Sequence, residues 1–368
     1  MRELALAFLR LGVTAFGGPA AHIAMMEDEF VRRRAWLSRE QFLDLVGAAG
    51  LIPGPNSTEV AIYIGYRRAG WRGLLIAGVC FILPAFLMVT AIAWSYVHFG
   101  RLPTVAGALY GIKAVIIAVI AQALAALAGS ALKSLWLLAL GAAAASASAL
   151  GVSPILVLLV AGIAGACGRA ARNSGTHASL VFMPGAFHAS PAAAPGLAKL
   201  FAVFLKMGAI VFGSGYVLLA FLRADLVEHG HWLTESQLMD AVSVGQFTPG
   251  PVFTTATFIG YLVAGLPGAV VATVGIFLPS FLLVAASGPL IPRLRGSPIA
   301  GGFLDGVNVA SLALMAVVGV QLGRAAIVDV PTALIAACSA VAMLRWRVNT
   351  AWLVLVGGLA GGVLSWLH

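Results

Sequence analysis

Ile52-Pro53-Gly54-Pro55 interrupts one apolar stretch of the chain, and Thr248-Pro249-Gly250-Pro251 interrupts another, 196 positions further on. Proline removes a backbone donor and clashes with the preceding helical turn, so neither stretch is expected to form one continuous helix. Inside a membrane, broken backbone is tolerated only where protein or a water-filled cavity satisfies its polar groups. The two Pro-Gly-Pro segments are therefore the leading candidates for a binding site.

These segments belong to a duplication that covers nearly the whole chain. Phe8-Leu9-Arg10-Leu11-Gly12 returns as Phe204-Leu205-Lys206-Met207-Gly208, and Ile64-Gly65-Tyr66 returns as Ile259-Gly260-Tyr261. The offset is 196 residues before the Pro-Gly-Pro and 195 after it, so the second copy lacks one residue. We expect a first transmembrane repeat at 1–170, a linker at 171–198 and a second transmembrane repeat at 199–368.

The composition excludes an ordinary soluble domain. The chain has 368 residues, of which 61% are hydrophobic and 10% are charged, and its mean hydropathy is +1.01. Soluble proteins carry roughly 25% charged residues. Long apolar runs recur from end to end, without the alternation of a membrane β-barrel, and so predict a polytopic helical membrane protein. Three isolated cysteines form no disulfide or zinc pattern, and no cofactor is expected.

The apolar runs predict the same plan in both halves. The first half has a broken segment at 4–26, a hairpin at 41–66, and spans near 72–98, 104–128, 133–150 and 153–169. The second half has a segment at 199–221, a hairpin at 237–261, and spans near 268–288, 303–323, 331–344 and 350–367. If each hairpin enters and leaves on one side, each half crosses the membrane five times. The two halves must then be inverted, as in many secondary transporters.

The distribution of basic residues agrees with inversion. With the linker in the cytoplasm, fifteen of the 22 lysines and arginines fall in cytoplasmic loops. Arg67-Arg68 in the first half corresponds to Leu262-Val263 in the second. We therefore predict an all-α polytopic membrane protein of two inverted-topology repeats, each with about five transmembrane helices plus one re-entrant Pro-Gly-Pro helical hairpin. Contact with anionic lipid explains the net charge of +9, so no nucleic-acid partner is expected.

The motifs resemble those of the chromate ion transporter family in its long-chain form with two homologous halves. The resemblance rests on Phe16-Gly17-Gly18-Pro19, Trp36-Leu37-Ser38, the Pro-Gly-Pro with Asn56, and the duplicated Ile-Gly-Tyr. It implies an inner-membrane protein that exports chromate, an oxyanion similar to sulfate, using the proton motive force. A transporter of sulfate or another small anion, by import or exchange, is the alternative. An embedded enzyme is a distant third, because no catalytic cluster is evident.

A tetrahedral dianion in a membrane needs compensating charge and many hydrogen-bond donors. Three sets of residues supply them: the cations Arg10, Lys113 and Lys206; the helix starts after each Pro-Gly-Pro, with Asn56, Ser57, Thr58, Thr254 and Thr255; and the glycines Gly17, Gly18 and Gly213. A buried charge costs about 3 kcal/mol on lenient scales, and a helix N-terminus favours anions. Each set also has a purely structural interpretation: ion pairing or snorkelling, helix capping, and tight helix packing.

Proton coupling requires a titratable group near the anion. Glu59 lies just beyond the first Pro-Gly-Pro, and Asp44 lies on the helix before it. A structural salt bridge from Glu59 to Arg10 or Arg67 is the competing interpretation, and His22 is a weaker candidate for the proton. No Gly-x-x-x-x-Gly-Lys-Ser/Thr motif occurs, so the energy is expected to come from a gradient. The expected partners are the oxyanion, protons and the lipid bilayer, with a homodimer left open.

Overall fold

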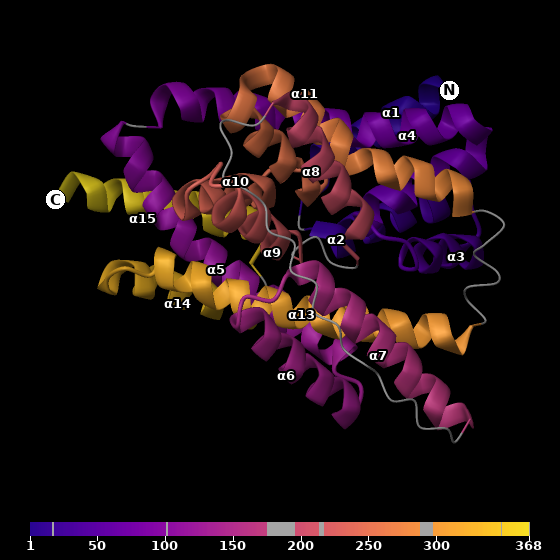
Figure 1. The fold of residues 1–368 in the computed structure, drawn as a ribbon. Coiled ribbons are helices and arrows are strands. Elements are labelled where there is room, and N and C mark those ends of the chain that lie inside the picture. The colour runs from indigo at the N-terminus through magenta and orange to yellow at the C-terminus, as the bar shows by residue number, and fades with distance from the viewer. Residues whose placement is uncertain are drawn as a thin grey trace.

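The computed structural model describes residues 1–16, 18–100, 102–174, 196–212, 217–287, 297–346 and 348–367, and every regular element in these ranges is helical (Figure 1). The first half contains α1 (Arg2–Thr14), α2 (Gly18–Glu27), a π-helical turn (Asp28–Arg33), α3 (Arg39–Ala49), α4 (Asn56–Phe99), α5 (Pro103–Ala131), α6 (Leu135–Ala149) and α7 (Pro154–Ser174). The second contains α8 (Leu197–Ile210), α9 (Leu218–Leu222), a π-helical turn (Arg223–His229), α10 (Glu235–Phe247), a 3₁₀ turn (Val252–Thr254), α11 (Thr255–Ser287), α13 (Pro298–Ala326), α14 (Val330–Trp346) and α15 (Thr350–Leu367). The predicted all-α architecture is confirmed, and most of the predicted linker lies outside the described residues.

Helices α4 and α11 are each folded back on themselves. The backbone leaves helical geometry at Ala69–Gly70 and at Ala264–Gly265, where the glycine φ angles are +58° and +60°. A Cβ atom on Gly65 would overlap the carbonyl oxygen of Gly73, so the two segments of α4 run antiparallel in close contact. Glycine is required at such turns because other residues adopt positive φ only at a cost. Each long helix is therefore a short first segment followed by a longer second one.

The helix α3 and the first segment of α4 form the predicted Pro-Gly-Pro hairpin. Ser38 begins α3 with a capping box, in which its hydroxyl accepts from the Gln41 N–H and the Gln41 side chain accepts from the Ser38 N–H. The Arg68 guanidinium lies 5.0 Å from the centre of the Trp36 ring. The outer ends of the two helices are therefore adjacent, and the Pro-Gly-Pro lies at the opposite end.

The two halves interleave. In Figure 1, α5, α6, α7, α13 and α14 gather in one part of the molecule, while α1 to α3 gather in another. Helix α7 of the first half packs against α13 of the second, and α5 of the first half packs against α15 of the second. Glycines allow the close approach: a Cβ atom on Gly165 would overlap the carbonyl oxygen of Gly302, and one on Gly361 would overlap that of Gly107. Both repeats therefore contribute helices to the same helical bundle.

Replacing Gly165 by leucine is expected to destabilise the protein by about 1–3 kcal/mol, because overpacking forces the two helices apart. Gly129 is the matched control, since nothing lies within 4 Å of a Cβ atom built there on α5. Thermal unfolding of the detergent-solubilised variants measures the difference. Equal loss of stability in both variants would contradict the close α7–α13 contact.

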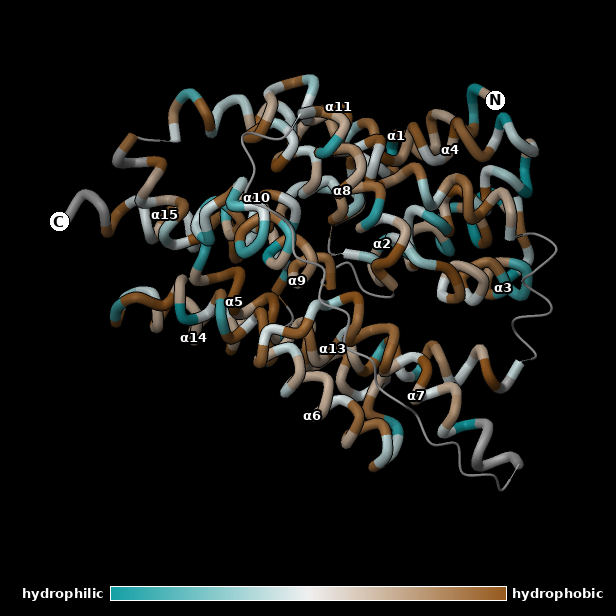
Figure 2. The backbone as a smooth tube through the Cα atoms, viewed as in Figure 1, coloured by the Kyte–Doolittle hydropathy of each residue, from teal (hydrophilic) through white to brown (hydrophobic). Residues whose placement is uncertain are grey.

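The helices carry an apolar exterior suited to lipid. Among the described residues, four segments are long and apolar enough to cross a membrane: Asn56–Phe99, Val105–Gly129, Val252–Ser287 and Ile299–Ala326. Figure 2 shows hydrophobic residues along these helices, and large aliphatic side chains such as Leu75 and Leu359 are exposed. In contrast, α6 has 15 residues and extends only about 22 Å. The number of complete crossings therefore stays a prediction.

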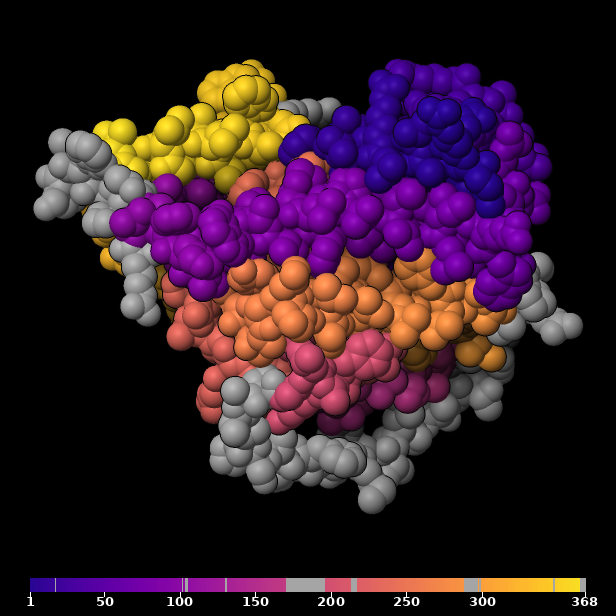
Figure 3. Space-filling view, turned by 90° about the horizontal axis from the view of Figure 1, so that it is seen from above, coloured from indigo at the N-terminus to yellow at the C-terminus, as the bar shows by residue number. Residues whose placement is uncertain are grey.

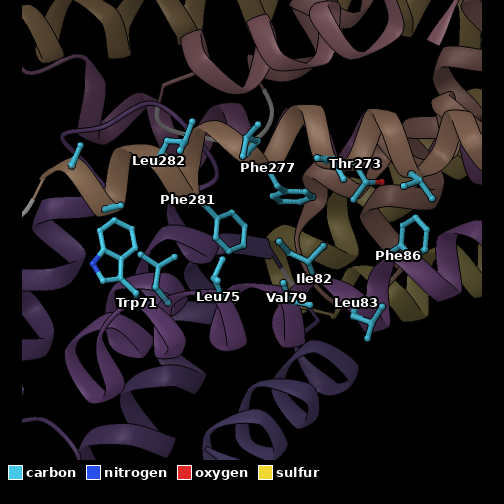
Figure 4. Close-up of a pocket in the computed structure, with 16 residues that line it drawn as sticks. Trp71, Leu75, Val79, Ile82, Leu83, Phe86, Thr273, Phe277, Phe281 and Leu282 are labelled. Carbon is cyan, nitrogen blue, oxygen red and sulfur yellow. The ribbon is translucent and has the colours of Figure 1, made fainter. Parts of the chain in front are cut away.

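One pair of equivalent helices from the two halves runs antiparallel. The second segments of α4 and α11 lie side by side on one face of the molecule (Figure 3) and line an apolar groove of about 990 Å³. In this groove Trp71 lies near the end that carries Leu282, whereas Phe86 lies near the end that carries Thr273 (Figure 4). A two-fold axis that relates antiparallel helices must lie perpendicular to them. This is the geometry that inverted repeats require.

Candidate functional site

Each Pro-Gly-Pro loop is bonded to the broken helix of the other half. The N–H of Gly54 donates to the carbonyl of Val211 at 2.8 Å, and the N–H of Gly250 donates to the carbonyl of Ala15 at 2.9 Å. Val211 follows the last residue of α8, and Ala15 follows the last residue of α1. The Pro-Gly-Pro loop of each repeat therefore contacts the chain just after the first helix of the other repeat.

His22 joins these elements further. Its ring is buried on α2, with Nε2 3.0 Å from the Ala15 carbonyl and Nδ1 3.2 Å from the Ser57 hydroxyl. A carbonyl oxygen can only accept, so Nε2 carries the proton, and Nδ1 of the neutral ring accepts from Ser57. From the sequence, His22 was only a weaker candidate for the proton, because no neighbouring motif connects it to either Pro-Gly-Pro. Its position shows that it connects the start of the first tip helix to the break after α1.

Glu59 is fully buried at the start of α4. Its Oε1 accepts from the Ser280 hydroxyl of α11 at 3.3 Å, while Oε2 has no hydrogen-bond partner among the described residues. A Cβ atom on Gly54 would overlap Oε1, so the carboxyl group packs directly over the Pro-Gly-Pro loop. Neither Arg10 nor Arg67 forms an ion pair with it in the described parts of the chain. The carboxyl group is available to a proton or a ligand.

Two further side chains in the same helical turn are unsatisfied. Asn56 Oδ1 and Thr58 Oγ1 are buried without a hydrogen-bond partner among the described residues. The backbone N–H groups of Asn56 and Ser57 begin the helix, where no earlier turn can accept from them. An unsatisfied buried polar group costs about 1–3 kcal/mol, and such groups usually have a partner. The first tip, defined as residues 54–59, therefore has the character of a ligand site.

The second tip is satisfied within the chain. The Thr254 hydroxyl donates to the Pro251 carbonyl, and the Thr255 hydroxyl donates to the Val252 carbonyl, each at 2.8 Å. Thr257 shares a hydrogen bond of 2.7 Å with Thr273. No side chain of the described second tip, residues 249–257, is left unsatisfied as Asn56, Thr58 and Glu59 are. The pseudo-symmetric tips are therefore chemically unequal.

The structure places two predicted anion-binding cations against carboxylates. Lys113 lies 3.0 Å from Asp240, which also accepts from the Tyr96 hydroxyl at 2.8 Å. Lys206 lies 2.5 Å from Asp225. These pairs neutralise both cations. The remaining predicted cation, Arg10, is exposed on α1.

The other predicted residues are placed as follows. Gly18 begins α2 with a φ of +78°, whereas Gly17 and Gly213 lie outside the described residues. Asp44 is exposed on α3, but its repeat equivalent Asp240 is buried on α10. Among the described residues, no ion pair or hydrogen bond joins the three cations to residues 56–59 of the first tip.

Replacing Lys113 by methionine is expected to destabilise the protein by about 3–5 kcal/mol, because Asp240 would remain as a buried unpaired charge. The added change Asp240→Asn is expected to recover much of this loss. Lys133→Met is the control, since the Lys133 side chain is 59% exposed in its pair with Asp305 and such pairs contribute little. Thermal unfolding of the variants measures their relative stabilities. If Lys113→Met is as stable as Lys133→Met but fails to bind oxyanion, Lys113 is a ligand residue after all.

An all-helical membrane protein with two related halves and broken helices joined at its centre has the architecture of a secondary transporter. A family model described as chromate transporter matches residues 2–166 and again residues 198–362. The chain belongs to this family, which confirms the resemblance drawn from its motifs. Family membership implies an integral membrane transporter rather than an enzyme.

Full-length relatives support the assignment. The chain is 34% identical to the chromate transport protein of Cupriavidus metallidurans, over 100% of this chain and 93% of the relative. It is 33% identical to the probable chromate transport protein of Synechococcus elongatus, over 100% of this chain and 96% of the relative. It is 30% identical to the chromate transport protein of Pseudomonas aeruginosa, over 96% and 90%. No solved structure matches the chain.

Proposed function

We propose that this protein exports chromate across a bacterial-type cytoplasmic membrane, as a secondary transporter driven by the proton motive force. The observation that carries the proposal is a set of three buried side-chain oxygens without a hydrogen-bond partner among the described residues: Asn56 Oδ1, Thr58 Oγ1 and Glu59 Oε2, all at the start of one helix. Relatives of similar length that bear the name chromate transport protein support the choice of oxyanion.

The first tip offers donors suited to a tetrahedral oxyanion. The free N–H groups of Asn56 and Ser57 and the hydroxyl of Thr58 point from a helix N-terminus, whose dipole favours negative charge. The Asn56 side-chain amide supplies two more donors when its NH₂ group faces the ion. Thr254 and Thr255 already donate to backbone carbonyls, so only the first tip is proposed to hold the anion.

Glu59 is proposed to link anion binding to the proton. An ionised carboxylate beside the site repels an oxyanion, whereas a protonated one donates a hydrogen bond to it. A dianion bound with one proton carries one net negative charge. A membrane potential that is negative inside drives this charge outwards by about 2.3 kcal/mol per 100 mV. The electrical part of the proton motive force therefore favours export, while a pH difference that is acid outside opposes the outward movement of the proton.

Flux into oriented proteoliposomes tests the proposal. Chromate flux should rise with an imposed potential and respond to an imposed pH difference, while chloride flux should not. Absence of any oxyanion flux under every gradient would refute a transport function at this site. Sulfate flux that exceeds chromate flux would favour the alternative, because charge and shape at the tip do not separate the two ions.

The proposed inverted topology has a separate test. In a chain whose native cysteines Cys80, Cys167 and Cys338 are replaced, Arg33→Cys should be shielded from an impermeant thiol reagent applied outside. His229→Cys, at the equivalent position in the second half, should react. The same result at both positions would contradict inversion.

A further inference from the structure

A small polar cavity lies at the outer end of the first hairpin, away from the Pro-Gly-Pro. It has a volume of about 200 Å³ and is lined by Trp36, Leu37, Gln41, Ile64, Arg67 and Arg68. Leu37 and Ile64 are buried and form its apolar wall. Nothing in the proposed transport chemistry of the first tip uses this cavity.

The cavity carries uncompensated positive charge. Arg34, its neighbour across the Trp36 ring, is paired with Glu29 and Glu3 at 2.7 Å each. In contrast, neither Arg67 nor Arg68 forms an ion pair with a carboxylate in the described part of the chain. Arg67 and Arg68 thus both line the cavity without an acidic partner, and an anion bound there would reduce the repulsion between their positive charges.

The orientation of Arg68 is restrained by aromatic stacking. The Trp36 ring stacks on Phe30 with ring centres 5.0 Å apart, and the Arg68 guanidinium lies 5.0 Å from its centre. Stacking restrains the planar guanidinium, whose parallel N–H groups match an oxyanion. The capped N-terminus of α3 at Gln41 adds the positive end of a helix dipole beside the same cavity.

We propose that this cavity binds a tetrahedral oxyanion between Arg67 and Arg68, as an anion site separate from the first tip. The same chemistry is presented by a free ion, such as the transported oxyanion, and by the phosphate of an anionic lipid. The site belongs to one half only, because Arg67 and Arg68 correspond to Leu262 and Val263 in the second repeat. It therefore marks the membrane side on which the basic loops lie.

The test compares Arg67→Gln/Arg68→Gln with wild type and with Arg72→Gln in the full-length protein. Arg72 is exposed on the same connection but does not line the cavity, so it controls for loss of charge. Equilibrium binding of radioactive sulfate to delipidated protein measures the free ion. Native mass spectrometry after reconstitution with phosphatidylglycerol measures retained lipid.

The double variant is expected to bind one of the two probes with an affinity at least about tenfold lower than wild type, since charged hydrogen bonds are lost. Loss of sulfate binding identifies the free ion, and loss of phosphatidylglycerol identifies the lipid. If both probes bind as they do to Arg72→Gln, the proposal is overturned. Should the double variant fail to fold, Arg67→Lys/Arg68→Lys keeps the charge but loses the planar fork, and weakened binding is again expected.

This result is separable from the transport function. A Glu59→Gln variant alters the first tip only, so its arginine-dependent binding of sulfate or lipid should remain. Arginine-dependent binding without oxyanion flux would retain this site and reject the proposed function. Oxyanion flux without arginine-dependent binding would retain the proposed transport function and reject this second anion site.

Discussion

Glu59→Gln is expected to abolish the response of oxyanion flux to a pH difference while the protein remains folded. Glutamine has nearly the same shape as glutamate, and its oxygen can still accept from Ser280 as Oε1 does at 3.3 Å. It cannot bind or release a proton, so the proposed link between proton and anion is lost. Because Oε2 has no partner among the described residues, the substitution breaks no hydrogen bond there.

Flux measured at several imposed pH differences, with the membrane potential clamped, isolates this effect. Glu40→Gln is the matched control, since Glu40 is exposed in the first turn of α3. Thermal unfolding of both variants establishes that they are folded. If Glu59→Gln retains the pH response of wild type, proton coupling must be assigned to another group, with His22 as the next candidate.

Gly54→Ala is expected to lose most transport and to destabilise the protein. Gly54 has a φ of +138°, a conformation that costs other residues about 1–3 kcal/mol. An added methyl group would also overlap the Glu59 carboxyl group and lie 2.5 Å from the Ser280 hydroxyl. Both groups must move, which displaces the first tip and weakens the hydrogen bond from Gly54 to Val211.

Gly70→Ala separates backbone strain from loss of space. Gly70 also has a positive φ, +58°, but nothing lies within 4 Å of a Cβ atom built there. Its substitution should cost about 1–2 kcal/mol and leave flux per folded molecule unchanged. Equal flux in Gly54→Ala and Gly70→Ala would contradict the packing of Glu59 over the Pro-Gly-Pro loop.

Local chemistry made the breaks in the helices predictable. Proline and glycine act on the residues next to them, so Pro53-Gly54-Pro55 and Pro249-Gly250-Pro251 could be recognised as interruptions from the chain alone. The structure agrees, with α4 beginning at Asn56 and a 3₁₀ turn beginning at Val252. The duplication could be recognised for the same reason, because a repeated motif is visible without knowing its contacts.

The partners of the cations could not be predicted in this way. Lys113 was considered an anion ligand because its neighbours in the sequence are apolar, yet it pairs with Asp240, which lies 127 positions away. Hydropathy reports the cost of burying a charge and contains no information on which distant carboxylate meets it. The same limit applies to His22, whose partner Ser57 belongs to another helix.

By itself, the sequence determined the class of the protein: a helical membrane protein, duplicated, with two broken hairpins. These properties follow from composition and short-range backbone chemistry. Only the tertiary structure decided which tip is equipped for a ligand. The threonines of the second tip resemble good donors in the sequence, but Thr254 and Thr255 are already bonded to the carbonyls beside them. In the first tip, Asn56, Thr58 and Glu59 each hold a buried oxygen that has no hydrogen-bond partner among the described residues. Hydrogen-bond satisfaction depends on every atom around a group, and that is a property of the folded chain.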